Sequence, residues 1–307
     1  MLSTAARLRV HLSHGVAARF ASSRGPIIGL MPDDDATPFW ICKSATGNLG
    51  VRRLRAEYHA LVHLAPWADE LQVPRVISWE DADDECCLVQ SGIDGLQDDT
   101  GLSTHLSEAQ LNRRFLEVLA WIDKFQTVAL PGFRRVIDVA AACAAQIEGR
   151  SEFSPAAAPV IQMLRNLGSL GLRSAVPTHG DFHWRNVLQQ HPGVGVIDWA
   201  SFTSGFPLQD RFSYIVNNVY FEPGRYFRLV ENYRHVFFSE STVCRWLASL
   251  LRSWGYSPQE SSQWFYCFLA SQLCLDADMP AQTWLEILDF LASHSYPPLA
   301  TPLPPPR

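Results

Sequence analysis

The sequence feature that most constrains the fold is the order and spacing of three polar residues, Asp181, Asn186 and Asp198. Between the asparagine and the second aspartate the sequence predicts a short β-hairpin, with strands at 186–189 and 194–198 around a Pro-Gly turn. Such a hairpin brings together side chains that are separated along the chain. Each of the three residue types is common in loops, but the ordered set on a loop, a strand, a turn and a second strand is specific.

The three side chains fit the chemistry of phosphoryl transfer. That reaction needs a hydroxyl group held in line with the phosphate, and metal ions that neutralise charge on the phosphates. On a loop, Asp181 can accept the proton of the hydroxyl group and orient its oxygen atom. Asn186 and Asp198 supply hard oxygen ligands of the kind that Mg²⁺ prefers. We therefore expect an ATP- and Mg²⁺-dependent kinase in which Asp181 is the catalytic base.

A second pair of residues, in the first part of the chain, supports this interpretation. Glu57 lies on the apolar face of a helix predicted at 52–65, at helical spacing from three leucines. A carboxylate on such a face is costly unless it is paired, and Lys43 at the end of the preceding strand is the expected partner. The pair would hold the lysine against the α- and β-phosphates of a nucleotide. The alternative is a Glu57 that reaches solvent at the rim of the face, with Lys43 as an ordinary strand-end charge.

The predicted elements divide the chain into a strand-rich part and a helix-rich part. Strands are expected at 19–22, 26–31, 37–43, 73–79 and 86–90. Helices are expected from 107 onward and at 136–149, 155–168, 207–220, 223–237, 240–254, 257–275 and 280–294. We therefore expect an α+β fold with a small antiparallel sheet lobe that contains one helix (1–92), a larger and mostly helical lobe (93–295) and a proline-rich tail (296–307).

The composition argues against several classes of protein. The formal net charge is −6 and the pI is about 5.9, whereas nucleic-acid binders usually carry a basic stripe, so we expect no nucleic acid as partner. No run approaches the roughly eighteen apolar residues of a membrane span. The seven cysteines have no zinc-site spacing, which favours reduced thiols and a cytoplasmic location. Residues 1–32 contain four arginines and no acidic residue, so either a mitochondrial presequence or a segment leading into the first strand fits them.

The catalytic segment carries a resemblance to a known family. His-Gly-Asp at 179–181, with Asn186 after it, and Ile-Asp-Trp at 197–199 resemble the signature of the aminoglycoside phosphotransferase and choline kinase family. The resemblance runs from about residue 19 to residue 295, and this segment is its specific part. It implies a two-lobed, protein-kinase-like fold in which Asp181 is the catalytic base and Asn186 and Asp198 bind magnesium. Protein kinases proper are less similar, because they have His-Arg-Asp and Asp-Phe-Gly at these places.

The resemblance also implies where a nucleotide would bind. Lys43 would bind phosphate, and Glu57 would orient the lysine. The hinge residues, which would offer backbone groups to the adenine, are Gln90, Ser91, Gly92 and Ile93. The turn that would cover the phosphates contains Ser23 and Gly25. Because hinge contacts are made by backbone groups, the sequence leaves the choice between ATP and GTP open.

Some positions depart from the pattern of the family. The turn over the phosphates, at 22–25, is short and holds a single glycine. Trp184 stands where the family usually has proline, and Ile122-Asp123 stands where Leu-His is frequent. None of these departures removes a catalytic group.

The acceptor pocket is the least specified part of the sequence. His183, Trp184 and Trp199 flank the reacting residues and are candidates to line it. Asp276 and Asp278 could attract a cationic substrate, with aromatic rings adding cation–π contacts. The alternative is that the aromatic residues belong to the core and that the two acids are solvated.

Three functions therefore stay open at this stage. The first is a kinase whose acceptor is a hydroxyl group of an amino sugar, an amino alcohol or a related small molecule. The second keeps the chemistry but makes the acceptor a Ser or Thr hydroxyl in a peptide, such as a biosynthetic precursor. The third is a nucleotide-binding scaffold without catalysis, against which the complete set of Asp181, Asn186 and Asp198 argues.

Overall fold

The computed structural model describes residues 16–20, 27–31, 40–82, 84–97, 107–128, 136–149, 157–166, 172–190, 192–219 and 241–275, together with residues 286 and 289. The chain divides into two compact units. Unit 1 consists of Met1–Asp99, Ala120–Ala129 and His179–Thr203. Unit 2 consists of Thr100–Leu119, Leu130–Thr178 and Ser204–Arg307. The lobe boundaries expected at residues 92 and 295 stay predictions.

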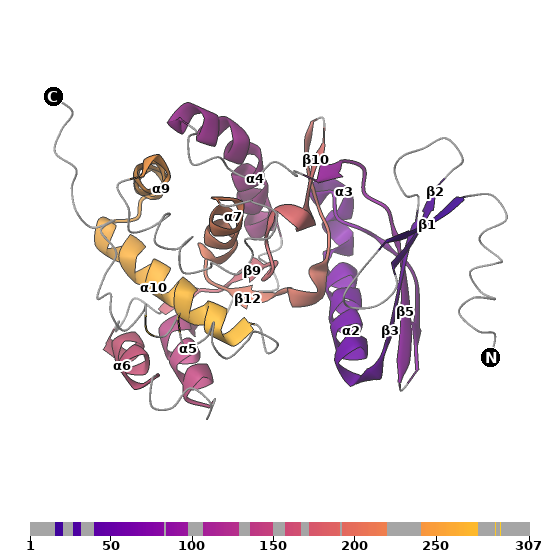
Figure 1. The fold of residues 1–307 in the computed structure, drawn as a ribbon, viewed down its shortest axis with the longest axis horizontal. Coiled ribbons are helices and arrows are strands. Elements are labelled where there is room, and N and C mark those ends of the chain that lie inside the picture. The colour runs from indigo at the N-terminus through magenta and orange to yellow at the C-terminus, as the bar shows by residue number, and fades with distance from the viewer. Residues whose placement is uncertain are drawn as a thin grey trace. The chain divides into compact units, whose positions relative to one another are not determined.

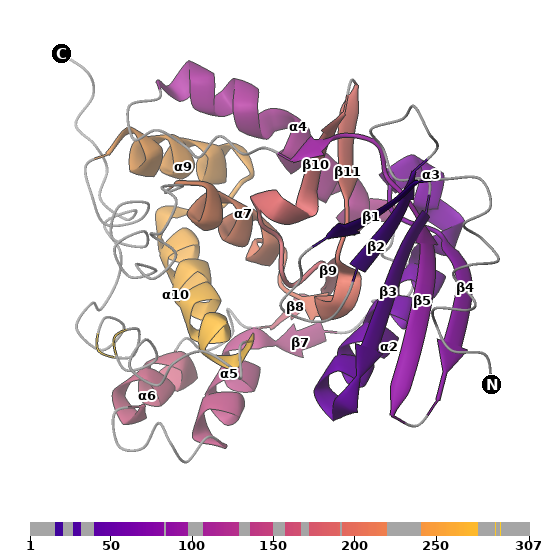
Figure 2. The ribbon, with the colours of Figure 1, turned by 45° about the vertical axis from the view of Figure 1, so that its right-hand side comes forward.

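Unit 1 contains a five-stranded antiparallel sheet with the order β1-β2-β3-β5-β4 (Figures 1 and 2). Its strands are β1 (Val16–Phe20), β2 (Ile27–Met31), β3 (Trp40–Thr46), β4 (Val76–Asp81) and β5 (Glu85–Ser91). The five strands expected in this part of the chain are all present, with ends that differ by a few residues. The predicted antiparallel sheet is therefore confirmed.

Helix α2 (Gly47–Leu64) lies against one face of this sheet (Figure 2). Its buried side chains, among them Leu54, Leu61 and Leu64, repeat at helical spacing and face the strands. The helix begins five residues before the predicted start, because Gly47 adopts a φ of 74° and so turns the chain directly from β3 into the helix. The 3₁₀ turn η2 (Ala65–Trp67) and the short helix α3 (Ala68–Leu71) follow it.

The rest of unit 1 is a hairpin with the turns on either side of it. Strands β10 (Val187–Gln190) and β11 (Gly193–Val196) pair antiparallel, and β6 (Leu96–Gln97) adds to β10. The hairpin expected from the spacing of Asn186 and Asp198 is therefore present. The 3₁₀ turns η6 (Trp184–Asn186) and η7 (Trp199–Ser201) flank it. Aromatic side chains form the core beneath these segments: Trp121, Phe125, Phe182, Trp199 and Phe202.

Unit 2 is mostly helical. It contains the first part of α4 (Glu108–Val128), then α5 (Val139–Glu148), α6 (Ala158–Asn166), α7 (Gln209–Val219), α9 (Thr242–Ser253) and α10 (Pro258–Leu275) (Figure 1). Short strands also occur: β7 (Val136–Asp138) pairs with β8 (Leu172–Ser174), and β9 (Val176–Thr178) pairs with β12 (Thr203–Gly205). α10 packs against α5 and α9.

Three of the predicted helices in this region differ from the structure or lie outside the described residues. The helix expected at 136–149 starts only at Val139, because Asp138 caps it by accepting a hydrogen bond from the Ala141 amide, and the three residues before it pair as β7. The helix expected at 223–237 lies outside the described residues, as does nearly all of the one at 280–294.

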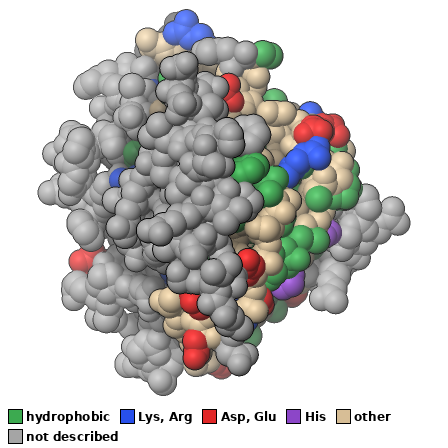
Figure 3. Space-filling model, turned by 90° about the vertical axis from the view of Figure 1, so that its right-hand side faces the viewer, with side chains coloured by type: hydrophobic (Ala, Val, Ile, Leu, Met, Phe, Trp, Pro, Cys, Tyr) green, Lys and Arg blue, Asp and Glu red, His purple; other side chains and the backbone are tan. Residues whose placement is uncertain are grey.

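None of the helices in the described part of the chain has the length and apolar character needed to cross a bilayer. On the face in Figure 3, basic side chains of the described residues lie at the upper edge and, on the right, beside acidic and hydrophobic side chains.

Candidate active site

Lys43 and Glu57 form a buried ion pair in unit 1. The Nζ atom of Lys43 on β3 lies 2.6 Å from Oε1 of Glu57 on α2, and the glutamate is 2% exposed. A carboxylate at this depth needs a charged partner, and the adjacent strand supplies one. The structure therefore brings together the two residues expected to pair, and Glu57 does not reach solvent.

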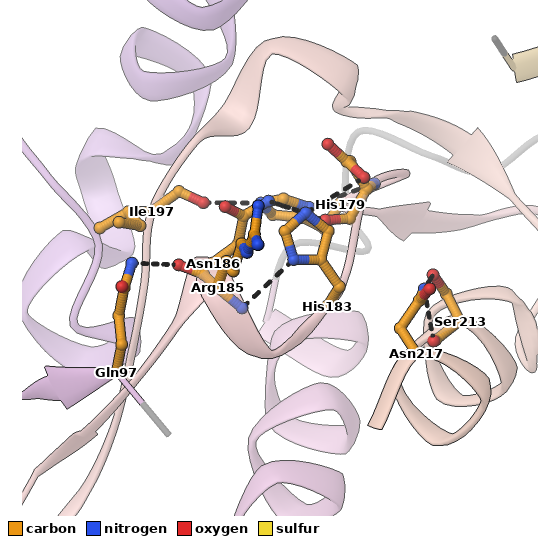
Figure 4. Close-up of polar contacts among 9 residues, drawn as sticks. Gln97, His179, His183, Arg185, Asn186, Ile197, Ser213 and Asn217 are labelled. Atoms are coloured by element: carbon orange, nitrogen blue, oxygen red, sulfur yellow. Dashed lines mark hydrogen bonds and ion pairs between the residues drawn. The ribbon is translucent and has the colours of Figure 1, made fainter. Parts of the chain in front are cut away.

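His179 connects the loop before Asp181 to the strand before Asp198. Its ring is fully buried, and its Nδ1 atom accepts a hydrogen bond from the Asp181 amide at 3.3 Å. Because Nδ1 accepts, the proton is on Nε2, which donates to the Ile197 carbonyl at 3.0 Å (Figure 4). The ring also packs edge-on against Trp199, 4.7 Å between centroids. His179 thus fixes the backbone of Asp181 relative to that of Asp198.

Asn186 makes a second connection between the same segments. Its side-chain Nδ2 atom donates to the Asp181 backbone carbonyl at 2.9 Å, and its backbone carbonyl accepts from the Ile197 amide at 3.0 Å. The side-chain nitrogen thus holds the loop, and the side-chain oxygen is the atom of the kind that Mg²⁺ binds. Gln97 on β6 supports this turn by donating to the Arg185 carbonyl at 2.7 Å (Figure 4).

Asp198 occupies an unusual backbone conformation. Its φ of 64° and ψ of 69° are left-handed, and it directly precedes η7. Aspartate tolerates this region better than most residues, and such strain persists only where the surroundings fix it. Here α2 packs against η7, and the rings of His63 and Phe202 lie 5.6 Å apart. The helix that carries Glu57 therefore also supports the turn after Asp198.

Gly180 explains why the loop is His-Gly-Asp. Its φ is +81°, and a Cβ atom there would lie 2.3 Å from the Ser201 carbonyl oxygen. Real Cβ atoms do not approach this closely, and the obstacle is backbone that cannot rotate away. The loop and η7 can therefore touch only with glycine at this position.

His183 lies beside the carboxylate of Asp181. Its Nδ1 atom accepts from the Arg185 amide at 3.2 Å, and its Nε2 atom lies 3.5 Å from Oδ1 of Asp181 and 3.3 Å from Nδ2 of Asn186. Burial lowers the pKa of His183 below its usual value, although the Asp181 charge opposes the shift. His183 therefore lies next to both Asp181 and Asn186, and its lowered pKa favours the neutral ring.

The two tryptophans named as candidates for the acceptor pocket are buried. Trp184 is 7% exposed, and the Arg185 guanidinium lies 5.0 Å from its ring centroid. Trp199 is fully buried and packs against Trp121 and Phe125. Trp199 therefore belongs to the core, which is the alternative that the sequence left open for such residues.

The end of α3 and the residue after it are tied to two other elements by contacts that the sequence did not indicate. The Trp121 indole donates to the Leu71 carbonyl at 2.7 Å, and the Lys124 ammonium donates to the Glu70 carbonyl at 2.8 Å. The Gln72 carbonyl accepts from the Val196 amide at 3.2 Å. These bonds join the end of the α2–α3 segment to α4 and to the strand that leads to Asp198.

The residues expected to contact a nucleotide are partly described. Gln90 is buried at the end of β5, and Ser91 exchanges hydrogen bonds with the backbone of Arg75 at 2.9 Å. Gly92 and Ile93, which follow, are half-buried. Four candidates lie outside the described residues: Ser23, Gly25, Asp276 and Asp278.

The donor atoms at the site fit magnesium. The described residues include no group of three or more His, Cys, Asp or Glu side chains placed to hold a metal ion. Mg²⁺ is commonly held by one or two protein carboxylates together with substrate phosphates and water. The Asn186 oxygen and the Asp198 carboxylate are a donor set of that kind.

A family profile matches most of the chain. The profile of the phosphotransferase enzyme family matches residues 33–258. A search of curated protein sequences finds no match.

Several solved structures share the fold. An aminoglycoside phosphotransferase from Streptomyces rimosus is 16% identical, with 95% of this chain and 99% of that chain covered and a TM-score of 0.52. A thermostable mutant of another aminoglycoside phosphotransferase, in a ternary complex with ADP and hygromycin B, is 15% identical, with 95% and 98% covered and a TM-score of 0.58. Choline kinase from Cryptosporidium parvum is 12% identical, with 92% and 88% covered and a TM-score of 0.51. The predicted α+β, protein-kinase-like fold is confirmed.

Proposed function

The chain belongs to the phosphotransferase enzyme family, and from this premise we propose that it is an ATP- and Mg²⁺-dependent kinase that phosphorylates a hydroxyl group of a small molecule. The observation that carries the proposal is the network around Asp181. His179 and Asn186 bind its backbone amide and carbonyl, and both also bind the backbone of Ile197, next to Asp198. These bonds fix the backbone around the residues that we propose as base and metal ligands, and phosphoryl transfer requires such fixed positions.

In the proposed mechanism Asp181 accepts the proton of the acceptor hydroxyl and orients its oxygen. His183 lies 3.5 Å from one oxygen of this carboxylate, and its lowered pKa favours the neutral ring. Lys43, held by Glu57, binds the phosphates of the nucleotide. Asn186 and Asp198 would hold Mg²⁺, which when bound neutralises charge on the phosphates.

The acceptor class is supported by likeness to other proteins. The solved structures with the same fold include an aminoglycoside phosphotransferase in complex with ADP and streptomycin, and a choline kinase. These ligands belong to those proteins; for this chain we propose an amino sugar, an amino alcohol or a related metabolite. A peptide hydroxyl as acceptor, and nucleotide binding without transfer, are outcomes that the experiment below separates. A cytoplasmic location is supported by the absence of disulfides among the described cysteines.

The test is transfer of the γ-phosphate from labelled ATP with Mg²⁺ to aminoglycosides, amino alcohols, sugars, nucleosides and Ser/Thr peptides. Asp181→Asn should lower turnover by about 10²-fold or more, because it removes the base while keeping the size of the side chain. Asp84→Asn is the matched control, since Asp84 is exposed in the turn between β4 and β5. Turnover of Asp181→Asn equal to that of the control would disprove the base assignment. Transfer to peptides alone would make the acceptor a Ser or Thr side chain.

A further inference from the structure

Two cysteine thiols lie in contact on neighbouring strands of the unit 1 sheet. The sulfur atoms of Cys42 on β3 and Cys87 on β5 are 3.5 Å apart, and neither is in a disulfide. Cys42 is buried, whereas Cys87 is only half-buried. A disulfide bond would bring the two sulfur atoms to about 2.05 Å. The pair therefore combines a half-buried cysteine with a buried one, and their sulfur atoms are in contact.

The pair lies on the sheet face opposite to the ion pair of the site. Successive residues of a strand point to opposite faces, and Lys43, which follows Cys42, points to Glu57 on α2. On β5, the thiol of Cys86 also points to α2, where it contacts a backbone carbonyl oxygen at 3.8 Å. Cys42 and Cys87 therefore share the other face, and each is next in sequence to a residue that faces the helix.

The two cysteines are diagonal neighbours rather than a directly opposed pair. Cys42 is opposite Val89, and Cys87 is opposite Ser44 (the two strands lie side by side in Figure 2). Diagonal neighbours in antiparallel strands are about 7–8 Å apart, beyond the span of about 4.4–6.8 Å between the Cα atoms of a disulfide. A disulfide here therefore requires β3 to shift relative to β5. Because Lys43 follows Cys42, this shift also moves the lysine relative to Glu57.

We propose that Cys42 and Cys87 form a reversible disulfide when a hydroperoxide oxidises them, and that the disulfide weakens nucleotide binding by displacing Lys43. The disulfide itself is inferred from the contact between the two sulfur atoms. Its effect on the nucleotide rests on the function proposed above.

The oxidation proceeds in two balanced steps. The Cys87 thiolate attacks one oxygen of hydrogen peroxide, the O–O bond breaks, and a sulfenic acid and hydroxide form. The Cys42 thiol then attacks the sulfenic sulfur, the S–S bond forms, and the hydroxyl group leaves as water with the proton of Cys42. With the proton that Cys87 gave up, the hydroxide becomes a second water. Two thiols are thus oxidised to one disulfide, and one peroxide is reduced to two waters.

The protonation of the thiols agrees with this order of steps. The hydrogen bond to Cys87, and then burial, raise the pKa of Cys42 above its usual value. The raised pKa favours the protonated thiol of Cys42, which is in contact with the sulfur of Cys87 at 3.5 Å. Burial raises the pKa of Cys244 to about 11 and that of Cys267 to about 12, so these thiols are poor nucleophiles at neutral pH. The half-buried Cys87 is the thiol that we expect to react first.

The experiment treats the full chain with graded hydrogen peroxide, maps the cross-linked peptides by mass spectrometry, and measures the Kd of a non-hydrolysable ATP analogue with Mg²⁺. We expect a Cys42–Cys87 cross-linked peptide, a Kd at least five-fold higher after oxidation, and recovery of both with dithiothreitol. Cys87→Ser and Cys42→Ala should form no such peptide and keep their Kd. Cys86→Ala, the matched control on the opposite sheet face, should respond like the natural chain.

The outcomes separate the parts of the inference. Consumption of thiols without a Cys42–Cys87 peptide overturns the disulfide. A cross-link that leaves the Kd unchanged overturns the coupling to Lys43. If the reduced protein binds no nucleotide, the proposed function fails, and the disulfide is still decided by the peptide map.

Discussion

At the scale of single residues, Gly180 meets two constraints that can be tested separately. Its backbone is left-handed, and its contact with Ser201 leaves no room for a Cβ atom. Gly180 has a φ of +81° and no room for a Cβ atom, while Gly255 has a φ of +82° and nothing within 4 Å. Alanine at either position adopts a left-handed conformation that costs about 1–2 kcal/mol. Only at position 180 must the backbone also move. We expect Gly180→Ala to lower phosphoryl transfer at least about ten-fold, because the loop of Asp181 is displaced from η7.

Gly255→Ala is the control for that substitution. It should lower the free energy of unfolding by the cost of the left-handed conformation, and it should leave the rate of phosphoryl transfer unchanged. Urea denaturation and initial transfer rates of both variants check this. If the two variants lose equal fractions of activity, the close approach at Ser201 has no role in placing Asp181.

His183 gives a residue-scale prediction for pH. Burial holds its folded-state pKa below the usual 6.5. Above pH 6.5 the histidine is neutral in both the folded and the unfolded chain, so it adds no pH dependence there. As the pH falls below 6.5 the unfolded chain gains a proton first, and stability is lost down to the folded-state pKa. We expect the midpoint of thermal unfolding to fall less steeply between pH 7 and pH 5 in His183→Gln than in the natural chain.

The exposed His59 supplies the comparison for this pH series. His59→Gln is the control for replacing a histidine by glutamine, because the side chain of His59 is exposed. A His183→Gln variant with the same slope as His59→Gln would show that His183 is not the residue that titrates.

At the scale of elements, the sequence predicted the helices and strands whose own residues form a recognisable pattern. The hairpin followed from a Pro-Gly turn between short strands, and α2 followed from leucines at helical spacing. The ion pair of Lys43 and Glu57 followed because a carboxylate on an apolar face needs a partner. The short strands β6, β7, β8, β9 and β12 were not predicted, because two or three residues form a strand only when a distant segment pairs with them.

The anchoring of the end of α3 is another feature that needed the structure. Nothing in the sequence indicates that the Trp121 indole binds the Leu71 carbonyl, since many acceptors are available to a buried N–H group. This bond, with that between the Val196 amide and the Gln72 carbonyl, joins α4, the α3 segment and the strand before Asp198. The spacing of residues in the sequence identified Asp198 as a candidate, and these contacts fix the position of the strand that leads to it.

The anchor can be tested with a pair of tryptophans. Trp121→Phe keeps an aromatic ring but leaves the Leu71 carbonyl without its donor, at a cost of about 1–3 kcal/mol. Trp246→Phe is matched, because its buried indole donates to Asn112 at 2.8 Å within unit 2. We expect both variants to lose similar stability in urea and only Trp121→Phe to bind nucleotide more weakly. Equal nucleotide affinities at equal stability would contradict a role for the anchor in the site.

At the scale of the whole molecule, the fold was more predictable than the substrate. The spacing of Asp181, Asn186 and Asp198 indicated the chemistry, and the likeness to solved structures, at 12–16% identity, confirms the fold. An acceptor is recognised by side chains that vary on a shared fold, so their pattern carries no general rule. The candidate acids Asp276 and Asp278 lie outside the described residues, and Trp199 belongs to the core. The acceptor therefore has to be found by experiment.

Nucleotide binding should stabilise the whole chain, and the dependence on magnesium should identify Asp198. A ligand that binds only the folded state adds about 2.7 kcal/mol of stability at 100 times its Kd. With Mg²⁺ and a non-hydrolysable ATP analogue we expect a clear rise in the midpoint of thermal unfolding. Asp198→Ala should lose most of this rise, because it removes a hard ligand from the metal. Without Mg²⁺, in the presence of EDTA, the analogue should shift the variant and the natural chain equally.

Asp198→Asn separates the metal ligand from the backbone, because asparagine also tolerates the left-handed conformation at this position. If the charge of Asp198 binds the metal, Asp198→Asn loses the Mg²⁺-dependent part of the rise although its ligand-free stability stays close to that of the natural chain. If Asp198 matters only because its backbone positions η7, Asp198→Asn keeps the full rise and Asp198→Ala alone loses it. Equal rises in all three proteins with Mg²⁺ present would refute the assignment of Asp198 as a metal ligand.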